Sequence, residues 1–289
     1  MKNKLIKAIA FDGRIRAYIT NTTDVTNEAI KTHDLWPSAA SVLSKTMTVG
    51  LMMGAMLKGE EALTIKIDGN GPIGNVVIDS DSKGNVRGYV DKPHVHFSRK
   101  QTLDDVTTLG YNGYIDVVKD LKLKDLYSST IPIQSGDLAK EFTYYFAMSE
   151  QTPSIVALGT MINEDNTCRV SGGMIIQLMP GHQESDIVYL ENKYEILNKF
   201  STLLTEHQDL TEILKLVFDD NFKVLETMDV RFHCDCTKEK FSAGIATLGS
   251  EEIEKIIEED EQAEVICHYC NTQYLFSKED LQNILKGIK

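Results

Sequence analysis

Four of the five cysteines of this 289-residue chain stand in two close pairs near its C-terminal end. The first pair is Cys234-x-Cys236 and the second is Cys267-x-x-Cys270. Cysteine thiolates are preferred zinc ligands, and two such pairs in one chain segment are typical of a tetrahedral zinc site. The sequence therefore predicts that Cys234, Cys236, Cys267 and Cys270 together hold one Zn²⁺ per chain in the reduced state.

The motif by itself leaves the role of the metal open. His233 and His268 flank the cysteines and could each replace one as a ligand, but four thiols already complete a site. The spacing of the first pair is tighter than the C-x₂₋₄-C spacing usual in structural zinc ribbons. Because the thiolate is also the oxidisable form of cysteine, the motif is compatible with a permanent structural zinc and with a redox switch.

The composition indicates a globular chain. Hydrophobic residues make up 42% of it and charged residues 25%, and the formal net charge of -13 disfavours binding to a phosphate backbone. Lys7 interrupts the apolar run near the N-terminus, and the longest apolar stretch, 48–57, is too short to span a bilayer. We therefore expect a cytoplasmic protein without nucleic acid or membrane as a partner. Without a G-x-x-x-x-G-K-[ST] loop, ATP-driven work is not expected either.

Residues 1–180 predict an N-terminal mixed α/β domain with a meandering sheet and a buried helix. Alternating residues around Asp12-Gly13 predict a hairpin over 5–20. Pro37 and Gly59 bracket an apolar segment that predicts a helix buried on all sides. Short segments bounded by Gly, Asp or Pro predict strands at 62–68, 75–81, 86–91 and 94–97. A helix is expected over 137–148, and strands or buried elements over 154–162 and 168–179.

Residues 181–230 predict an amphipathic helical linker. Apolar residues recur at helical spacing over 187–204 and again over 210–217. Short helices of this kind are marginal in isolation, so they need a surface on which to lie. We therefore expect this linker to dock conditionally on a neighbouring folded part of the chain.

Residues 231–289 predict a small C-terminal zinc-binding domain, which completes an α+β multidomain fold. Ser250 is expected to cap one helix, and Ser277 with Asp280 to form a capping box at the start of the last helix. A segment of about sixty residues with few large apolar groups buries little surface. Zinc binding is worth roughly 10–16 kcal/mol in small zinc-finger peptides, so the metal would supply folding energy here.

Two further motifs have plainer explanations than function. Gly69-x-Gly71-x-x-Gly74 matches a dinucleotide-binding pattern, but it precedes a predicted strand instead of a helix, which favours a glycine turn without a bound cofactor. Cys168 lies in no recognisable nucleophile motif, so a buried free cysteine is expected and no catalytic residue is assigned.

Two other groups of side chains are ambiguous. His94 and His96 could share one face of a strand and bind a metal, but no third ligand is evident. Four methionines of the apolar helix could form an adaptable client-binding surface, although such residues more often belong to a core. These are Met47, Met52, Met53 and Met56.

The sequence resembles the redox-regulated 33-kilodalton heat-shock chaperonins of bacteria. The C-x-C and C-x-x-C pairs match that family's zinc signature. Three other segments also resemble it: GNGPIGNVVIDSDSKGNVRGYV at 69–90, YYFAMSEQTPS at 144–154 and SGGMIIQLMPG at 171–181. The resemblance covers essentially the whole chain in the right order.

The resemblance implies an ATP-independent holdase that is inactive when reduced and zinc-bound. Oxidants would form the disulfides Cys234–Cys236 and Cys267–Cys270, unfold the zinc domain, destabilise the linker and expose apolar surface. Partners would be unfolding client proteins and, on activation, a second copy in a homodimer. No bond is made or broken in the client, so an enzyme is not expected. The alternatives are an RNA-modifying enzyme with an accessory zinc ribbon and an adaptor whose zinc is purely structural.

Overall fold

The structure, a computed structural model, describes residues 3–100, 102–207 and 209–288. The chain divides between His233 and Cys234 into two units, each with its own apolar core. In the described part of the chain, no helix combines the length and the apolar character needed to cross a bilayer. The predicted fold class, a mixed α/β domain followed by helices and a small cysteine-bearing domain, is confirmed.

The first unit contains a five-stranded antiparallel sheet in the order β10-β11-β2-β1-β12. The predicted N-terminal hairpin is confirmed: β1 (Lys4–Ala10) pairs with β2 (Ile15–Asn21) across η1 (Phe11–Gly13). Asp12 and Gly13 both adopt positive φ angles, which a tight turn of this kind requires. The remaining strands are β10 (Ser154–Ile162), β11 (Cys168–Leu178) and β12 (Phe222–Asp229).

The second sheet of this unit has six strands in the order β13-β5-β4-β3-β8-β9. Its centre is the predicted meander, β3 (Ala62–Asp68), β4 (Asn75–Asp81) and β5 (Asn85–Val90). The hairpin of β8 (Tyr114–Asp120) and β9 (Tyr127–Pro132) was not predicted from the sequence. The short strand β13 (Arg231–Phe232) runs parallel to β5 at one edge.

The prediction of a strand at 94–97 is wrong. Its backbone bonds to the start of a helix instead of to a strand: Ala39 N–H donates to Val95 O at 3.2 Å, and Phe97 N–H donates to Ser38 Oγ at 2.9 Å. Only the following residues pair as strands, in the two-residue β6 (Ser98–Arg99) and β7 (Thr102–Leu103).

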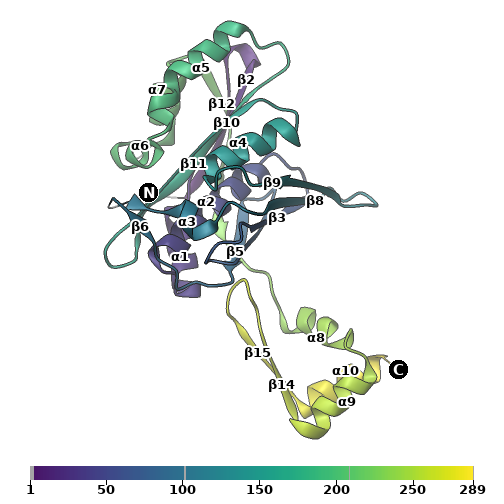
Figure 1. Ribbon diagram of the computed structural model, residues 1–289. Coiled ribbons are helices and arrows are strands. Elements are labelled where there is room, and N and C mark those ends of the chain that lie inside the picture. The colour runs from purple at the N-terminus through teal and green to yellow at the C-terminus, as the bar shows by residue number, and fades with distance from the viewer. Residues whose placement is uncertain (1–2, 101, 208, 289) are drawn as a thin grey trace. The chain divides into compact units, whose positions relative to one another are not determined.

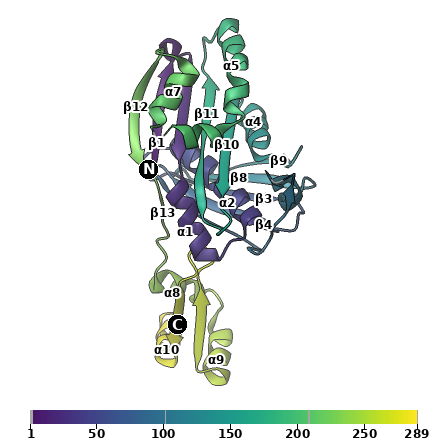
Figure 2. The ribbon, with the colours of Figure 1, turned by 90° about the vertical axis from the view of Figure 1, so that its left-hand side faces the viewer.

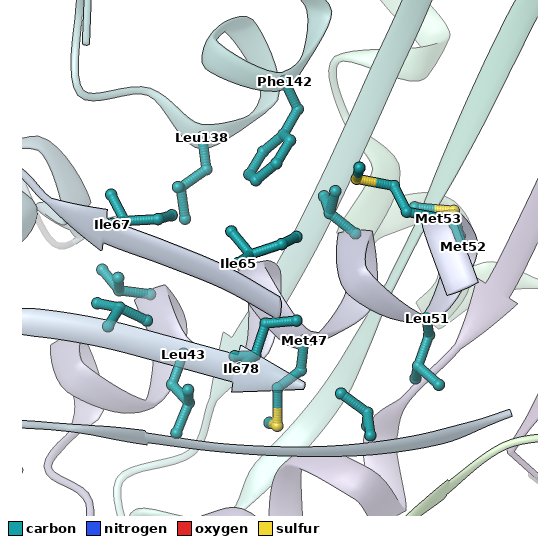
Figure 3. Packing of buried hydrophobic residues seen from close by; sticks show 14 of the residues in the cluster. Leu43, Met47, Leu51, Met52, Met53, Ile65, Ile67, Ile78, Leu138 and Phe142 are labelled. Atoms are coloured by element: carbon teal, nitrogen blue, oxygen red, sulfur yellow. The ribbon is translucent and has the colours of Figure 1, made fainter. Parts of the chain in front are cut away.

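The predicted buried helix is α2 (Pro37–Gly54), which packs against strands of both sheets. It ends at Gly54 and not near Gly59, because the following residues form tighter turns: Met56 N–H donates to Met53 O at 3.0 Å and Leu57 N–H donates to Gly54 O at 2.9 Å. Met47, Met52 and Met53 are at most 2% exposed, and Figure 3 shows them among the aliphatic side chains of the core. Three of the four methionines therefore belong to the core, which decides against the client-surface interpretation; Met56 is partly buried against it.

Three other helices flank these sheets. They are α1 (Thr23–His33), the one-turn α3 (Asp105–Leu109) and α4 (Leu138–Met148). The predicted helix at 137–148 is thus confirmed, and Asp137 caps it by accepting from Ala139 N–H at 3.1 Å.

Three helices cover the face of the five-stranded sheet that is turned away from α2 (Figure 1). They are α5 (Glu184–Leu197), α6 (Phe200–Glu206) and α7 (Leu210–Phe218). The sheet is therefore apolar on both faces. Leu5 of β1 belongs to the core around α2, and its neighbour Ile6 belongs to the core under α5–α7. This alternation follows from the two-residue period of a strand.

The helical prediction for 181–230 is wrong for its last part. Residues 222–229 form β12, which pairs antiparallel with β1 at the edge of the sheet, beside β1 in Figure 2. The apolar residues with helical spacing end at Phe218, and the following segment satisfies its backbone groups by pairing with a strand from the other end of the chain.

Over its described residues, 234–288, the second unit contains three helices and one hairpin, which can be followed in Figure 2. Its helices are α8 (Lys238–Ala246), α9 (Ser250–Glu259) and α10 (Lys278–Ile288), and its strands are β14 (Gln262–Ile266) and β15 (Gln273–Ser277). Its cluster of buried apolar side chains is small, as expected: Ile245, Ile253, Phe276 and Leu281.

Two capping predictions for this unit have different outcomes. Ser277 N–H donates to Asp280 Oδ2 at 2.9 Å and Asp280 N–H donates to Ser277 Oγ at 3.3 Å, so the capping box is confirmed. The prediction that Ser250 caps α9 is wrong, because the N-cap residue is Gly249, whose φ of 86° places the chain where a serine would be strained.

Candidate metal centre

The four paired cysteines converge at one place in the second unit. Cys234 and Cys236 lie in the extended segment before α8, and Cys267 and Cys270 lie in the turn between β14 and β15. The four Sγ atoms all lie within 4.8 Å of one another. The structure therefore brings together the two thiol pairs that sequence spacing singled out.

The sulfur positions suit a tetrahedral ion. A Zn–S bond of about 2.3 Å implies Sγ···Sγ separations of about 3.8 Å in an ideal tetrahedron. Cys234 Sγ lies 3.8 Å from Cys267 Sγ, and Cys236 Sγ lies 3.2 Å from Cys270 Sγ. Neither His233 nor His268 belongs to this cluster of potential ligands. The donor set fits Zn²⁺ with four thiolates.

The turn between β14 and β15 orients the second pair. Cys267 N–H donates to Thr272 O at 3.0 Å, and Asn271 N–H donates back to Cys267 O at 2.8 Å. Asn271 takes a φ of 54°, a left-handed conformation that asparagine tolerates better than most residues. These bonds close a tight turn that holds Cys267 and Cys270 close together, and Cys270 N–H donates to Cys267 O at 3.3 Å within it.

Two hydroxyl groups border the sulfurs. Tyr274 OH lies 3.2 Å from Cys236 Sγ and 3.0 Å from Cys236 O. Thr272 Oγ1 lies 3.2 Å from Cys270 Sγ. A thiolate can only accept, so in the metal-binding state each hydroxyl is the donor to its sulfur. Neither residue was predicted from the sequence, although they follow Cys270 by two and four positions.

The metal-free thiols differ in acidity. Burial raises the pKa of Cys236 to about 12, against the opposing hydrogen bond from Tyr274. Burial also raises the pKa of Cys267. At Cys270 burial acts in the same sense, but hydrogen bonds from Thr272 and from the neighbouring thiols outweigh it and lower the pKa to about 7. A cation that holds all four as thiolates must therefore displace protons.

Comparison with known proteins identifies the family of this chain. The model of the family described as "Hsp33 protein" matches residues 3–277. The chain belongs to the Hsp33 family. Its relatives include the 33 kDa chaperonins of Bacillus velezensis, 48% identical, and Bacillus subtilis, 47% identical; each alignment covers 97% of this chain and 97% of the relative.

A solved structure agrees with this assignment. The crystal structure of the 33 kDa chaperonin (heat shock protein 33 homolog) from Thermotoga maritima matches with a TM-score of 0.91 and 31% identity, over 99% of both chains. The resemblance inferred from sequence is therefore confirmed, and with it membership of a chaperone family.

Other candidate residues of this Hsp33 chain belong to the first unit. Cys168 is buried at the start of β11, and burial raises its pKa to about 12, which favours the protonated, unreactive thiol. His94 Nε2 lies 2.8 Å from Asp34 Oδ2 and its ring lies against Trp36, while His96 lies near Ser38. Because 94–97 is not a strand, the two histidines do not share a strand face.

The glycine motif of the Hsp33 chain serves chain packing. An added Cβ at Gly71 would lie 2.3 Å from backbone atoms of Leu109, and one at Gly69 would lie 2.2 Å from Leu109 O. The loop then enters β4, as the predicted strand requires. Close approach of two backbones accounts for these glycines without a phosphate ligand.

Proposed function

We propose that this protein is a redox-regulated, ATP-independent holdase that binds unfolding client proteins under oxidative stress. The observation that carries the proposal is the convergence of four thiol sulfurs within 4.8 Å in a unit whose core, over its described residues, is a small cluster centred on four buried apolar side chains. Such a unit depends on its cross-link for stability, and a cross-link made of thiolates is open to oxidation. We place its action in the cytoplasm, where thiols are kept reduced until stress.

In the reduced protein, Cys234, Cys236, Cys267 and Cys270 would hold one Zn²⁺. The bound ion would keep all four thiols deprotonated and would contribute roughly 10–16 kcal/mol of folding free energy, as in small zinc-finger peptides. The hydrophobic core centred on Ile245, Ile253, Phe276 and Leu281 is small, so loss of that contribution would strongly destabilise this unit.

On oxidation, we propose disulfides within each pair, Cys234–Cys236 and Cys267–Cys270. Disulfide sulfurs are no longer thiolate ligands, so the two halves of the cluster lose the cross-link between them. Residues 231–289, the switch domain of this proposal, would then unfold. Pairing within each half cannot restore the link, because each disulfide closes only a local ring.

The signal would pass to residues 181–230, which act in the proposal as a linker on a core of residues 1–180. Cys234 directly follows β12 and β13 in the chain. The helices α5–α7 hide an apolar face of the five-stranded sheet. Tyr194 is 49% exposed, and a cavity of about 770 Å³ lies among Leu138, Ile155 and Leu197. Undocking these helices would expose apolar surface to clients and to a second copy in a homodimer.

A single assay tests the proposal. The reduced, zinc-loaded protein is treated with hydrogen peroxide, zinc release is followed with a chelating dye, and suppression of aggregation of a heat-denatured client is measured without ATP. We expect zinc release and client protection to rise together. Loss of zinc without client protection would indicate a purely structural metal, as in an adaptor, and would overturn the proposal; an RNA-modifying enzyme would likewise leave the client unprotected.

A further inference from the structure

The hydroxyl of Tyr274 occupies a position from which it can govern the reactivity of one sulfur. Its oxygen lies 3.2 Å from Cys236 Sγ and 3.0 Å from Cys236 O, so its single proton is within reach of either acceptor. Thr272 Oγ1 has the corresponding place beside Cys270 Sγ, at 3.2 Å. One cysteine of each pair is thus hydrogen-bonded to a hydroxyl group of the β15 end of the hairpin.

The position of this hydroxyl is held by its surroundings. Tyr274 lies in β15, opposite Val265 of β14, and its ring contacts that of Phe241 in α8 with the centroids 5.0 Å apart. A half-buried ring packed in this way limits the rotation of the side chain. The hydroxyl is therefore held beside Cys236.

We propose that Tyr274 is a positioning residue that restrains the oxidation of Cys236 and so raises the oxidant concentration at which the switch responds. This inference rests on the proposed redox function. A hydroxyl that donates to a thiolate withdraws electron density from the sulfur, and outer hydrogen bonds of this kind tune metal–thiolate sites. In the metal-loaded protein every ligand sulfur is already deprotonated, so the hydrogen bond acts on its nucleophilicity alone.

The step that Tyr274 opposes is the attack on peroxide. The Cys236 thiolate attacks one oxygen of hydrogen peroxide; an S–O bond forms, the O–O bond breaks and hydroxide leaves, which yields a sulfenic acid. The Cys234 thiolate then attacks that sulfur, forms the S–S bond and expels a second hydroxide. Two thiolates lose two electrons in total, and one peroxide gains them.

The test uses the full-length, reduced, zinc-loaded protein and three variants. Tyr274→Phe removes the hydroxyl and keeps the ring on Phe241. Thr272→Val makes the equivalent change beside Cys270, and Tyr194→Phe changes a half-exposed tyrosine of α5 as a control. Each protein receives a series of hydrogen peroxide concentrations, and the formation of each disulfide is timed by alkylation and mass spectrometry.

We expect Tyr274→Phe to speed formation of the Cys234–Cys236 disulfide about fivefold, which corresponds to about 1 kcal/mol and to the loss of one hydrogen bond. Thr272→Val should instead speed the Cys267–Cys270 disulfide, and Tyr194→Phe neither. Wild-type kinetics in Tyr274→Phe, or equal acceleration of both pairs, would overturn the proposal, because a merely structural role affects both pairs alike.

A second substitution keeps the test decisive if Tyr274→Phe fails to hold zinc. Incorporation of 3-fluorotyrosine at position 274 preserves the ring and makes the hydroxyl a stronger donor. Oxidation of Cys236 should then be slower than in the wild type; an unchanged or faster rate would contradict the inference. If wild-type oxidation releases zinc without client protection, the proposed function fails, but these rates still decide the role of Tyr274.

Discussion

Cys236 Sγ and Cys270 Sγ lie 3.2 Å apart although 34 positions separate the two residues in the chain. The contact joins the segment before α8 to the turn between β14 and β15. Because the small core supplies little cohesion, a link across these two segments is what the proposed switch would make and break.

The double variant Cys267→Ser/Cys270→Ser should lose tight zinc binding and unfold residues 231–289, because two hydroxyl groups do not replace two thiolates. Hydrogen exchange should report unprotected amides there and normal protection in the core around α2. Cys168→Ala, which removes the cysteine outside the cluster, serves as the control and should keep one zinc per chain. Stoichiometric tight zinc in the double variant would refute the four-thiolate assignment.

Zinc affinity should fall steeply as the pH falls. Burial raises the pKa of Cys236 and Cys267, so these thiols take up protons readily once the metal is released. Release therefore consumes more than one proton, and we expect the affinity to fall by more than roughly tenfold per pH unit between pH 8 and 6. Competition with a chelator of known affinity at each pH measures this slope. A slope near zero would exclude thiolate ligation.

The start of α5 is held by an ion pair, and its loss should loosen the linker. Arg14 donates to the Asp186 carboxylate from Nε at 2.8 Å and from Nη2 at 3.2 Å, and the Asp186 side chain is 4% exposed. Asp186→Asn should reduce protection of α5 by about 2 kcal/mol in hydrogen exchange. It should also give partial client protection in the reduced state. Unchanged exchange in α5 would show that the pair does not hold the helix.

Because of the same ion pair, the stability of α5 should depend on pH in the acidic range. The hydrogen bond from Arg14 lowers the pKa of Asp186 below its ordinary value. Its stabilising effect is therefore complete above that ordinary value and is lost as the pH falls through the lowered pKa in the folded protein. Protection of α5 should decline below about pH 4 in the wild type. The decline should be smaller in Asp186→Asn, and an equal decline in both would attribute it to other groups.

The crossing from β12 to β13 depends on Gly84. Its φ is 82°, its carbonyl accepts from Arg231 N–H at 2.9 Å, and an added Cβ would lie 2.4 Å from Asp229 O. Gly84→Ala should therefore cost about 2 kcal/mol, from backbone strain and from displacement of the crossing chain. Gly13→Ala is the matched control, because Gly13 has a φ of 88° but no atom near an added Cβ, so only strain of about 1 kcal/mol applies. Chemical denaturation measures both; equal losses would show that the contact with Asp229 adds nothing.

Some elements could be predicted from sequence because their causes are local. The hairpin at Asp12-Gly13, the start of α2 at Pro37 and the capping box of Ser277 and Asp280 each depend on residues within a few positions. The spacing of the four cysteines is also local within each pair, and it sufficed to single out the candidate metal centre.

Tertiary structure alone decided the features that depend on distant partners. Residues 222–229 form a strand because β1, more than 200 positions earlier in the chain, has one edge that β2 leaves unpaired. The backbone of 94–97 bonds to the start of α2, and the Tyr274 hydroxyl reaches Cys236 only through the fold of the hairpin. Composition and periodicity indicate which residues are buried or need a hydrogen-bonding partner. Which distant residue becomes that partner is determined only by the folded chain.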